Sequence, residues 1–232
     1  MKAFFGGKKG PPILINYYTL IKLFKKGSVY SSSTTFVFKL GPMVSSLAAS
    51  ITVLMFLPIA GFNPVFSFNG DVILSVFSCG LRRFSPLRAA MDTASPFEGM
   101  GAAREAYFPV ICEAAMFMIL IFLPILTGQE LQLSAYFAGS STQNMWSLAG
   151  APLVFIVLSF FIILLTENSR VPVDDPATHL ELTMIHEVMV LDHSGPDFGL
   201  IELGSFFKLF FYSTIISRMI LPLYIRRYSD SR

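Results

Sequence analysis

An acidic stretch in the last third of the chain carries the strongest chemical signal. Seven of the fifteen acidic residues fall between positions 167 and 197, where only Arg170 opposes them. They are Glu167, Asp174, Asp175, Glu181, Glu187, Asp192 and Asp197. Repulsion among crowded carboxylates raises some of their pKa values towards neutrality, where a group can take up and release protons. The stretch is therefore either a proton-transfer site or a solvated acidic loop.

One further carboxylate stands inside an apolar run. Glu113 lies near the start of the run at 110–127, where an ionised acid is functional by default unless it reaches the membrane interface. Its expected partner is Arg104, if the preceding loop folds back over the helix end. Arg170 could likewise hold Glu167 through a bidentate pair. We expect proton or ion coupling at these residues and the loop acids: Arg104, Glu113, Glu167, Arg170, Asp174, Glu181, Glu187 and Asp192.

Metal and redox chemistry find little support in the sequence. His179, His186 and His193 recur every seven residues, which on a helix keeps them about 10 Å apart, too far to share one metal ion. A proton relay and a structural role both remain open for them. Cys79 and Cys112 stand singly in apolar runs, so a disulfide framework or an iron–sulfur site is not expected. We expect this chain to bind no cofactor and no metal.

The composition indicates a membrane protein. Hydrophobic residues make up 53% of the 232 and charged residues 14%, against about 25% charged in a soluble domain. Several apolar runs also approach the 20 or so residues that span a bilayer as a helix. A net charge of +2 is too small to indicate nucleic acid as a partner. A free-standing enzyme is also disfavoured, because no nucleophile–base pair or phosphate-binding glycine loop is visible.

The elements that must position these residues are membrane helices. We predict an all-α, polytopic transmembrane helix bundle of four or five spans. Four are clear, at 36–60, 110–127, 146–166 and 200–225. The fifth, 71–91, crosses only if Arg82 and Arg83 face protein or water, because an arginine in hydrocarbon is costly.

The ends and loops complete the predicted organisation. Residues 1–36 form a basic N-terminal arm, whose run at 17–26 suits a helix lying in the membrane interface or packed on protein. Residues 37–232 form the transmembrane domain. Lysines in the arm place it in the cytoplasm, and alternation then puts the loops 92–109 and 167–199 on the same side.

The amino-acid sequence of the acidic stretch resembles that of a known family. The segment ENSRVPVDDPATHLELTMIHEVMVLDHSG at 167–195 resembles the loop of respiratory complex I subunit 1. It is more similar still to the homologous membrane subunit of group 4 nickel–iron hydrogenases, with which we associate the wording HLELTMIHE. The family signature, E-x-N-R-x-P-x-D-x-P and then a glutamate-rich helix, is matched here by Glu167, Arg170, Pro172, Asp174, Pro176 and Glu181.

Two further segments extend the resemblance. DTASPFEGMGAARE at 92–105 resembles the hydrogenase-type loop before a transmembrane helix, and Arg104 and Glu113 match an arginine and a glutamate of the complex I pattern. Residues 8–26 resemble the amphipathic stretch after the family's first transmembrane helix. Because that family has roughly eight membrane helices, the resemblance implies one helix before and two after this sequence.

The resemblance implies a membrane subunit of a multi-subunit, energy-converting oxidoreductase in the plasma membrane. Such a subunit anchors the peripheral redox arm and couples electron transfer to proton or sodium translocation. Iron–sulfur clusters and a nickel–iron centre are then expected in partner subunits. The expected partners are the lipid bilayer, peripheral hydrogenase or dehydrogenase subunits and antiporter-like membrane subunits. Two alternatives stay open, a quinone-site subunit of a complex I-type NADH dehydrogenase and a transporter or scaffold subunit without a redox partner.

Overall fold

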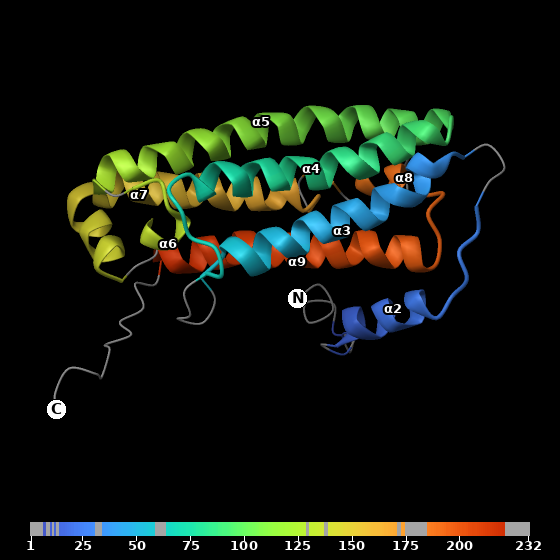
Figure 1. Ribbon diagram of the computed structural model, residues 1–232, viewed down its shortest axis with the longest axis horizontal. Coiled ribbons are helices and arrows are strands. Elements are labelled where there is room, and N and C mark those ends of the chain that lie inside the picture. Colours follow the sequence, from blue (N-terminus) through green and yellow to red (C-terminus); the bar gives the residue numbers. More distant parts are fainter. Residues whose placement is uncertain are drawn as a thin grey trace.

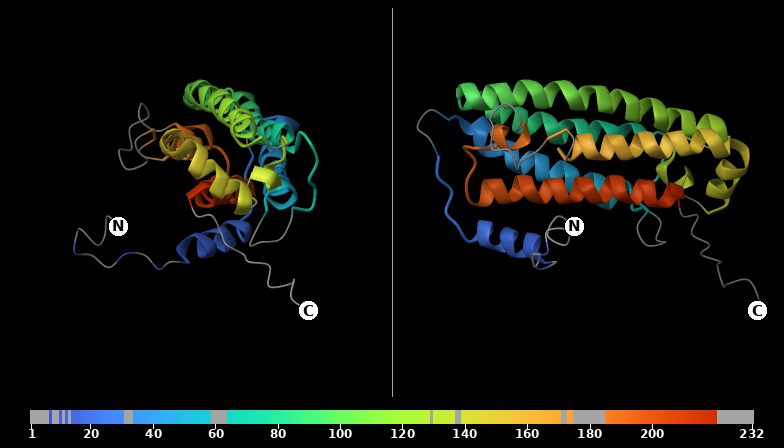
Figure 2. Two further views of the ribbon diagram at one scale, coloured as in Figure 1. Left: turned by 90° about the vertical axis from the view of Figure 1, so that its left-hand side faces the viewer. Right: turned by 180° about the vertical axis from the view of Figure 1, so that it is seen from behind.

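Helices make up all the regular structure of the described residues. The computed structural model describes residues 7, 10, 12, 14–30, 34–58, 64–128, 130–136, 139–170, 173–174 and 185–220. Its helices are α2 (Ile15–Phe24), α3 (Phe36–Phe56), α4 (Asp71–Asp92), α5 (Pro96–Thr127), α6 (Leu133–Tyr136), α7 (Gly139–Glu167), α8 (His186–Met189) and α9 (Pro196–Ile220). The five longest helices lie alongside one another in an elongated bundle, and α2 lies outside it beside α9 (Figure 1, Figure 2).

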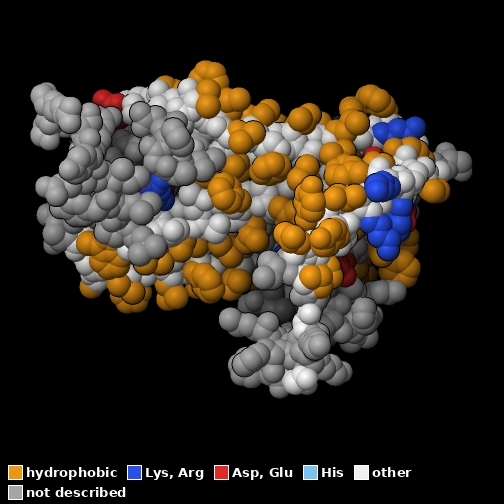
Figure 3. Space-filling view, turned by 90° about the horizontal axis from the view of Figure 1, so that it is seen from below, with side chains coloured by type: hydrophobic (Ala, Val, Ile, Leu, Met, Phe, Trp, Pro, Cys, Tyr) orange, Lys and Arg blue, Asp and Glu red, His pale blue; other side chains and the backbone are white. Residues whose placement is uncertain are grey.

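The bundle has the dimensions and surface of a membrane protein. Four helices are long and apolar enough to cross a membrane, at Phe36–Phe56, Pro96–Ile125, Gly150–Glu167 and Pro196–Ile220. Apolar side chains cover much of the face drawn in Figure 3, and most of its lysine and arginine side chains gather near one end. Apolar surface this extensive is rare in soluble monomers. The prediction of an all-α polytopic bundle with four or five spans is confirmed.

Helix α4 is the conditional fifth span, and it meets its condition. It has 22 residues, long enough to cross, but two arginines interrupt its apolar sequence near the middle. Arg82 and Arg83 are 6% and 7% exposed because they face the interior of the bundle. The preceding helix, α3, approaches α4 closely at Gly41, where an added Cβ would lie 2.7 Å from the Cβ of Ala89. Small residues at such crossings are typical of membrane helices.

Helix α5 begins much earlier than hydropathy indicates. The segment predicted as a loop, 92–109, is mostly the start of this helix, which runs from Pro96 to Thr127. Ser95 has extended backbone angles, Pro96 occupies the first turn and Glu98 follows it, all of which are typical of a helix start. The prediction of a loop was wrong because it followed apolarity, whereas alanine- and arginine-containing sequence is helical without being apolar.

The apolar core fills one half of the bundle. Its fully buried side chains on α5, α7 and α9 include Met116, Leu120, Leu123, Leu153, Phe160, Tyr212 and Ile215. Trp146 donates from its indole Nε1 to the carbonyl of Met219 at 3.0 Å. This bond links α7 to α9 near the end of the bundle that is remote from α8.

The other end of the bundle is built differently, because α7 does not extend as far as α5 and α9 (Figure 1). Helix α7 ends at Glu167, and the chain returns through the short helix α8 before α9 begins at Pro196. Helix α8 packs on the first turns of α5, where Gly101 approaches the backbone of Ile185 and Met189. A smaller apolar cluster forms there.

The N-terminal arm contains the predicted amphipathic helix. Helix α2 has no buried residue, and it touches α9 at Gly199 through Leu23 and Phe24. Tyr17 and Ile21 are exposed. The packing of one edge on protein is therefore observed, whereas a position in the membrane interface stays a prediction.

Candidate ion-coupling site

Four helices bring ionised side chains together inside the bundle. Arg83 of α4 lies with its Nη1 3.1 Å from Oε1 of Glu113 on α5, and its Nη2 donates to Oε1 of Glu167 at the end of α7. The Nζ of Lys208, midway along α9, lies 3.5 Å from the second carboxylate oxygen of Glu167. We call Arg83, Glu113, Glu167 and Lys208 the charge cluster. Its members hold one another in place, because a charge this deeply buried needs a partner.

Further polar groups border the charge cluster. Arg82 and Tyr212 are close enough to interact electrostatically with Glu167. The Nε of Arg82 and the hydroxyl of Tyr212 are buried and have no hydrogen-bond partner among the described residues. Buried polar groups of this kind are sites where ordered water is retained. Three cations (Arg82, Arg83 and Lys208) thus lie near two carboxylates (Glu113 and Glu167). The unpaired polar atoms among these groups could bind water.

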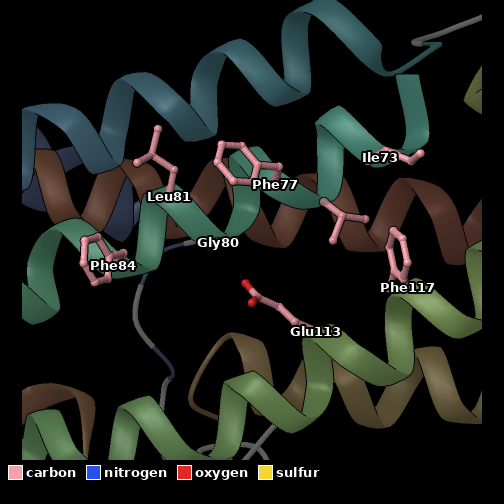
Figure 4. A pocket seen from close by; sticks show the side chains of 8 residues that line it. Ile73, Phe77, Gly80, Leu81, Phe84, Glu113 and Phe117 are labelled. Carbon is pink, nitrogen blue, oxygen red and sulfur yellow. The ribbon is translucent and has the colours of Figure 1, made fainter. Parts of the chain in front are cut away.

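Glu113 connects the charge cluster with the outer face of the bundle. Its side chain projects from α5 towards Gly80 of α4 (Figure 4), and an added Cβ at Gly80 would lie 3.2 Å from its Oε1. The glycine therefore leaves space for the carboxylate against the α4 backbone. Glu113 also lines a cavity of about 460 Å³ between α4 and α5, whose other walls are mostly apolar.

A second set of groups leads from the loop towards the charge cluster. His186, at the start of α8, has its Nδ1 3.8 Å from Oε1 of Glu105 on α5. Glu105 is 5% exposed, and it interacts electrostatically with Lys208. Acid and base groups thus follow one another from α8 to the α4–α5 cavity, in the order His186, Glu105, Lys208, Glu167, Arg83 and Glu113.

The loop acids predicted as coupling residues occupy several different environments. Asp174 is buried and accepts the backbone N–H groups of Ile185 and His186, both at 3.1 Å, which fixes the start of α8. The side chains of Glu187 and Asp192 are exposed. Glu181 lies outside the described residues. Of the predicted acids in the described part of the loop, only Glu167 enters the charge cluster.

Both arginine pairings predicted from the sequence were wrong. Arg104 and Glu113 stand nine residues apart on the continuous helix α5, about 13 Å along its axis, so no loop folds back to join them. Arg170 has an exposed side chain, whereas Glu167 turns inward to Arg83 and Lys208. Arg83 takes the place expected of both arginines. The sequence carried one signal for it, an arginine within a membrane-length helix, which marks a functional group unless it only reaches the interface.

The histidines do not share one helical face. His186 belongs to the four-residue helix α8, and His193 lies beyond it, stacked on Phe38 of α3 with ring centroids 4.0 Å apart. His179 lies outside the described residues. Burial lowers the pKa of His193 to about 4. Within the described residues no group of three histidines, cysteines or acids is placed to hold a metal ion.

Comparison with known proteins places the chain among respiratory and hydrogenase membrane subunits. Hydrogenase-4 component C of Escherichia coli K12 is 27% identical over 224 residues, which are 96% of this chain and 68% of that protein. Formate hydrogenlyase subunit 4 of the same organism is 27% identical over 205 residues, 85% of this chain and 62% of the relative. A subunit of the NADH-quinone oxidoreductase of Rickettsia felis is 25% identical over 209 residues, 90% of this chain and 60% of that protein. The chain thus spans about two thirds of the length of these relatives.

A solved structure shares the fold. A chain of the membrane-bound sulfane sulfur reductase, an archaeal respiratory membrane complex, matches with a TM-score of 0.70 at 22% identity, over 95% of this chain and 70% of that one. The sequence profile described as NADH dehydrogenase matches residues 2–224, nearly the whole sequence. Because this match covers nearly all of the sequence, the chain belongs to the NADH dehydrogenase family.

Proposed function

We propose that this chain is the membrane subunit of an energy-converting oxidoreductase of the membrane-bound hydrogenase type. In this role it anchors the peripheral redox arm and couples electron transfer to proton or sodium translocation. The similarity to Hydrogenase-4 component C and formate hydrogenlyase subunit 4 supports this branch. The proposed setting is the plasma membrane, with residues 167–199 facing the cytoplasm beside hydrogenase or dehydrogenase subunits, and with antiporter-like subunits alongside in the membrane.

The charge cluster is the observation that carries the proposal. A structural membrane anchor has no use for four ionised groups inside its bundle, where each is costly unless paired. Glu167 accepts from Arg83 and faces Lys208, so a proton arriving on Glu167 would weaken its hold on both cations at once. Arg83 would then interact more strongly with Glu113 than with Glu167. A proton gained at one side of the cluster thereby changes the charge balance at the other.

The size of the electrical effect is adequate for this coupling. A unit charge about 12 Å away changes a buried group's energy by about 1.4 kcal/mol at an effective dielectric of 20, which is one pKa unit. Electron arrival in a docked partner would therefore shift proton occupancy in the row from His186 to Glu167. We expect the iron–sulfur clusters and the nickel–iron centre in partner subunits, as the family resemblance implies.

The loop residues have a separate proposed role. Glu181, Glu187 and Asp192 would line the face on which the partner docks, and Asp174 would hold α8 in position beneath it. Arg104 and Arg170 would then contribute positive charge near the same end of the bundle. These assignments rest on the sequence signature and on the position of α8 beside α5.

A quinone-linked complex is the second candidate. The similarity to the NADH-quinone oxidoreductase protein of Rickettsia felis favours it, and the same charge cluster would serve in both settings. Purification of the tagged chain in mild detergent separates the two, because the co-purifying subunits differ. A nickel–iron hydrogenase subunit with hydrogen-dependent dye reduction supports the first candidate, and quinone-reductase subunits support the second. Recovery of the chain without any redox partner would contradict both.

The coupling role is tested by Glu167→Gln in membrane vesicles that contain the assembled complex. We expect electron transfer to continue while the ion gradient formed per electron falls at least fivefold. Glu130→Gln is the matched control, since Glu130 is exposed at the other end of the bundle. An unchanged gradient in an assembled Glu167→Gln complex would remove the charge cluster from the mechanism.

A further inference from the structure

A continuous groove runs along the outer face of α4. The cavity of about 460 Å³ between α4 and α5 adjoins a second one of about 210 Å³ between α3 and α4, and the two share Leu81 and Phe84 as walls. Five of the α4 residues that line them recur at helical spacing and form one stripe: Ile73, Phe77, Leu81, Phe84 and Arg88. We call this stripe with its two cavities the α4 groove.

The two ends of the α4 groove differ in chemistry. At one end Arg88 is exposed, with its guanidinium carbon 5.6 Å from the centre of the Phe84 ring. Among the described residues no carboxylate lies within salt-bridge distance of Arg88. The rest of the stripe is apolar and exposed, for example Phe77 at 69%. The inner wall carries the carboxylate of Glu113 (Figure 4).

Arg88 lies at the depth expected of lipid headgroups. It follows Arg83 by five residues, about 7.5 Å along α4, and Arg83 contacts Glu167, the residue at which the span of α7 ends. Arg88 is therefore beyond the end of the shortest span, while Leu81 and Phe77 lie on the hydrocarbon side of that boundary. From Arg88 to Ile73 the groove extends about 22 Å, more than the roughly 15 Å of one hydrocarbon leaflet.

We propose that the α4 groove binds an anionic phospholipid, with its phosphate on Arg88 and an acyl chain along Phe84, Leu81 and Phe77. An arginine without a carboxylate partner suits a phosphate, which accepts two parallel N–H bonds from one guanidinium. A helix is about 10 Å across, so recesses of these volumes admit an acyl chain rather than a helix. The bound chain covers the outer side of Glu113 and separates this carboxylate from bulk lipid and water.

The proposal is tested on the purified complex without any assay of coupling. A photoreactive benzophenone residue in place of Phe77 should, on irradiation in membranes containing phosphatidylglycerol, attach to a phospholipid. The mass of the adduct identifies its partner. Attachment to another protein subunit would show that protein covers the groove and would overturn the proposal.

Lipid retention provides the quantitative arm. After purification in mild detergent, we expect Arg88→Gln to retain about tenfold less phosphatidylglycerol at this site, the equivalent of about 1.4 kcal/mol. Leu81→Trp, which fills the groove without changing charge, should have the same effect. The matched controls are Arg170→Gln and Leu54→Trp, both exposed positions away from the groove. Equal retention in all variants, or equal loss in the controls, would refute the proposal whatever the outcome for Glu167.

Discussion

Arg83 compensates two carboxylates at once, because its nitrogens face Glu113 and Glu167 on different helices. In Arg83→Gln both acids would stay buried without a guanidinium. We expect this variant to lose about 3–5 kcal/mol of stability and to unfold at a clearly lower temperature in detergent, followed by circular dichroism. Arg83→Lys should fall in between, since one ammonium cannot bridge both acids. Equal unfolding temperatures in Arg83→Gln and the exposed control Arg170→Gln would contradict this account.

His193 should make stability depend on pH. Its buried ring has a pKa of about 4, below the unfolded value of about 6.5, so folding favours the neutral form. Its contribution is full above pH 6.5 and is lost as the pH falls towards 4, by about 3 kcal/mol in total. His193→Phe keeps the stacking on Phe38 and removes the proton. Unfolding temperatures at pH 7.5 and 5 should therefore differ less in this variant than in the wild type, and an equal difference would exclude His193 as the cause.

At the scale of elements, α8 depends on one carboxylate from outside it. Asp174→Ala removes the acceptor of two N–H groups at the start of α8, each bond contributing about 1 kcal/mol. Hydrogen exchange followed by mass spectrometry should show amides of 185–192 exchanging about tenfold faster or more, with α7 and α9 unchanged. Asp192→Asn is the control, because the side chain of Asp192 is exposed. Equal exchange in both variants would show that α8 is held by packing alone.

The sequence predicted the helices better than their limits. The apolar runs located α3, α7 and α9 because a lipid-facing helix must be apolar. They could not reveal that α5 starts at Pro96, since the first turns of this helix pack on α8 and carry fewer apolar residues. Nor could the seven-residue spacing of the histidines show that α8 ends at Met189, before His193.

At the scale of the whole molecule, the charge cluster arises from helices that are far apart in the sequence. The sequence singled out Glu113 as a carboxylate inside an apolar run and Glu167 as part of the acidic stretch. It considered Arg82 and Arg83 of α4 only as an obstacle to crossing the membrane. It could not pair them, since the pairing depends on how α4, α5, α7 and α9 pack around one point. Opposite charges embedded in separate predicted spans are therefore best considered together, as candidate partners across a bundle.

The orientation of the whole chain in the membrane gives a further prediction. Glu187 follows α7 at the end where α5 begins, and Glu130 lies just beyond the other end of α5, so the bilayer should separate them. In a background with Cys79→Ala and Cys112→Ala, we expect Glu187→Cys to react with an impermeant maleimide only in inverted vesicles. These vesicles are first stripped of peripheral subunits, so that the cytoplasmic side and the docking face are exposed. Glu130→Cys should react only from outside, in intact spheroplasts. The reason is that segments rich in lysine and arginine stay in the cytoplasm, and the basic arm lies beside the start of α9, at the end of the bundle opposite Glu130. The background without an introduced cysteine reports labelling of other subunits. Reaction of Glu187→Cys from outside would reverse the proposed topology and place the acidic loop on the wrong side for a cytoplasmic redox arm.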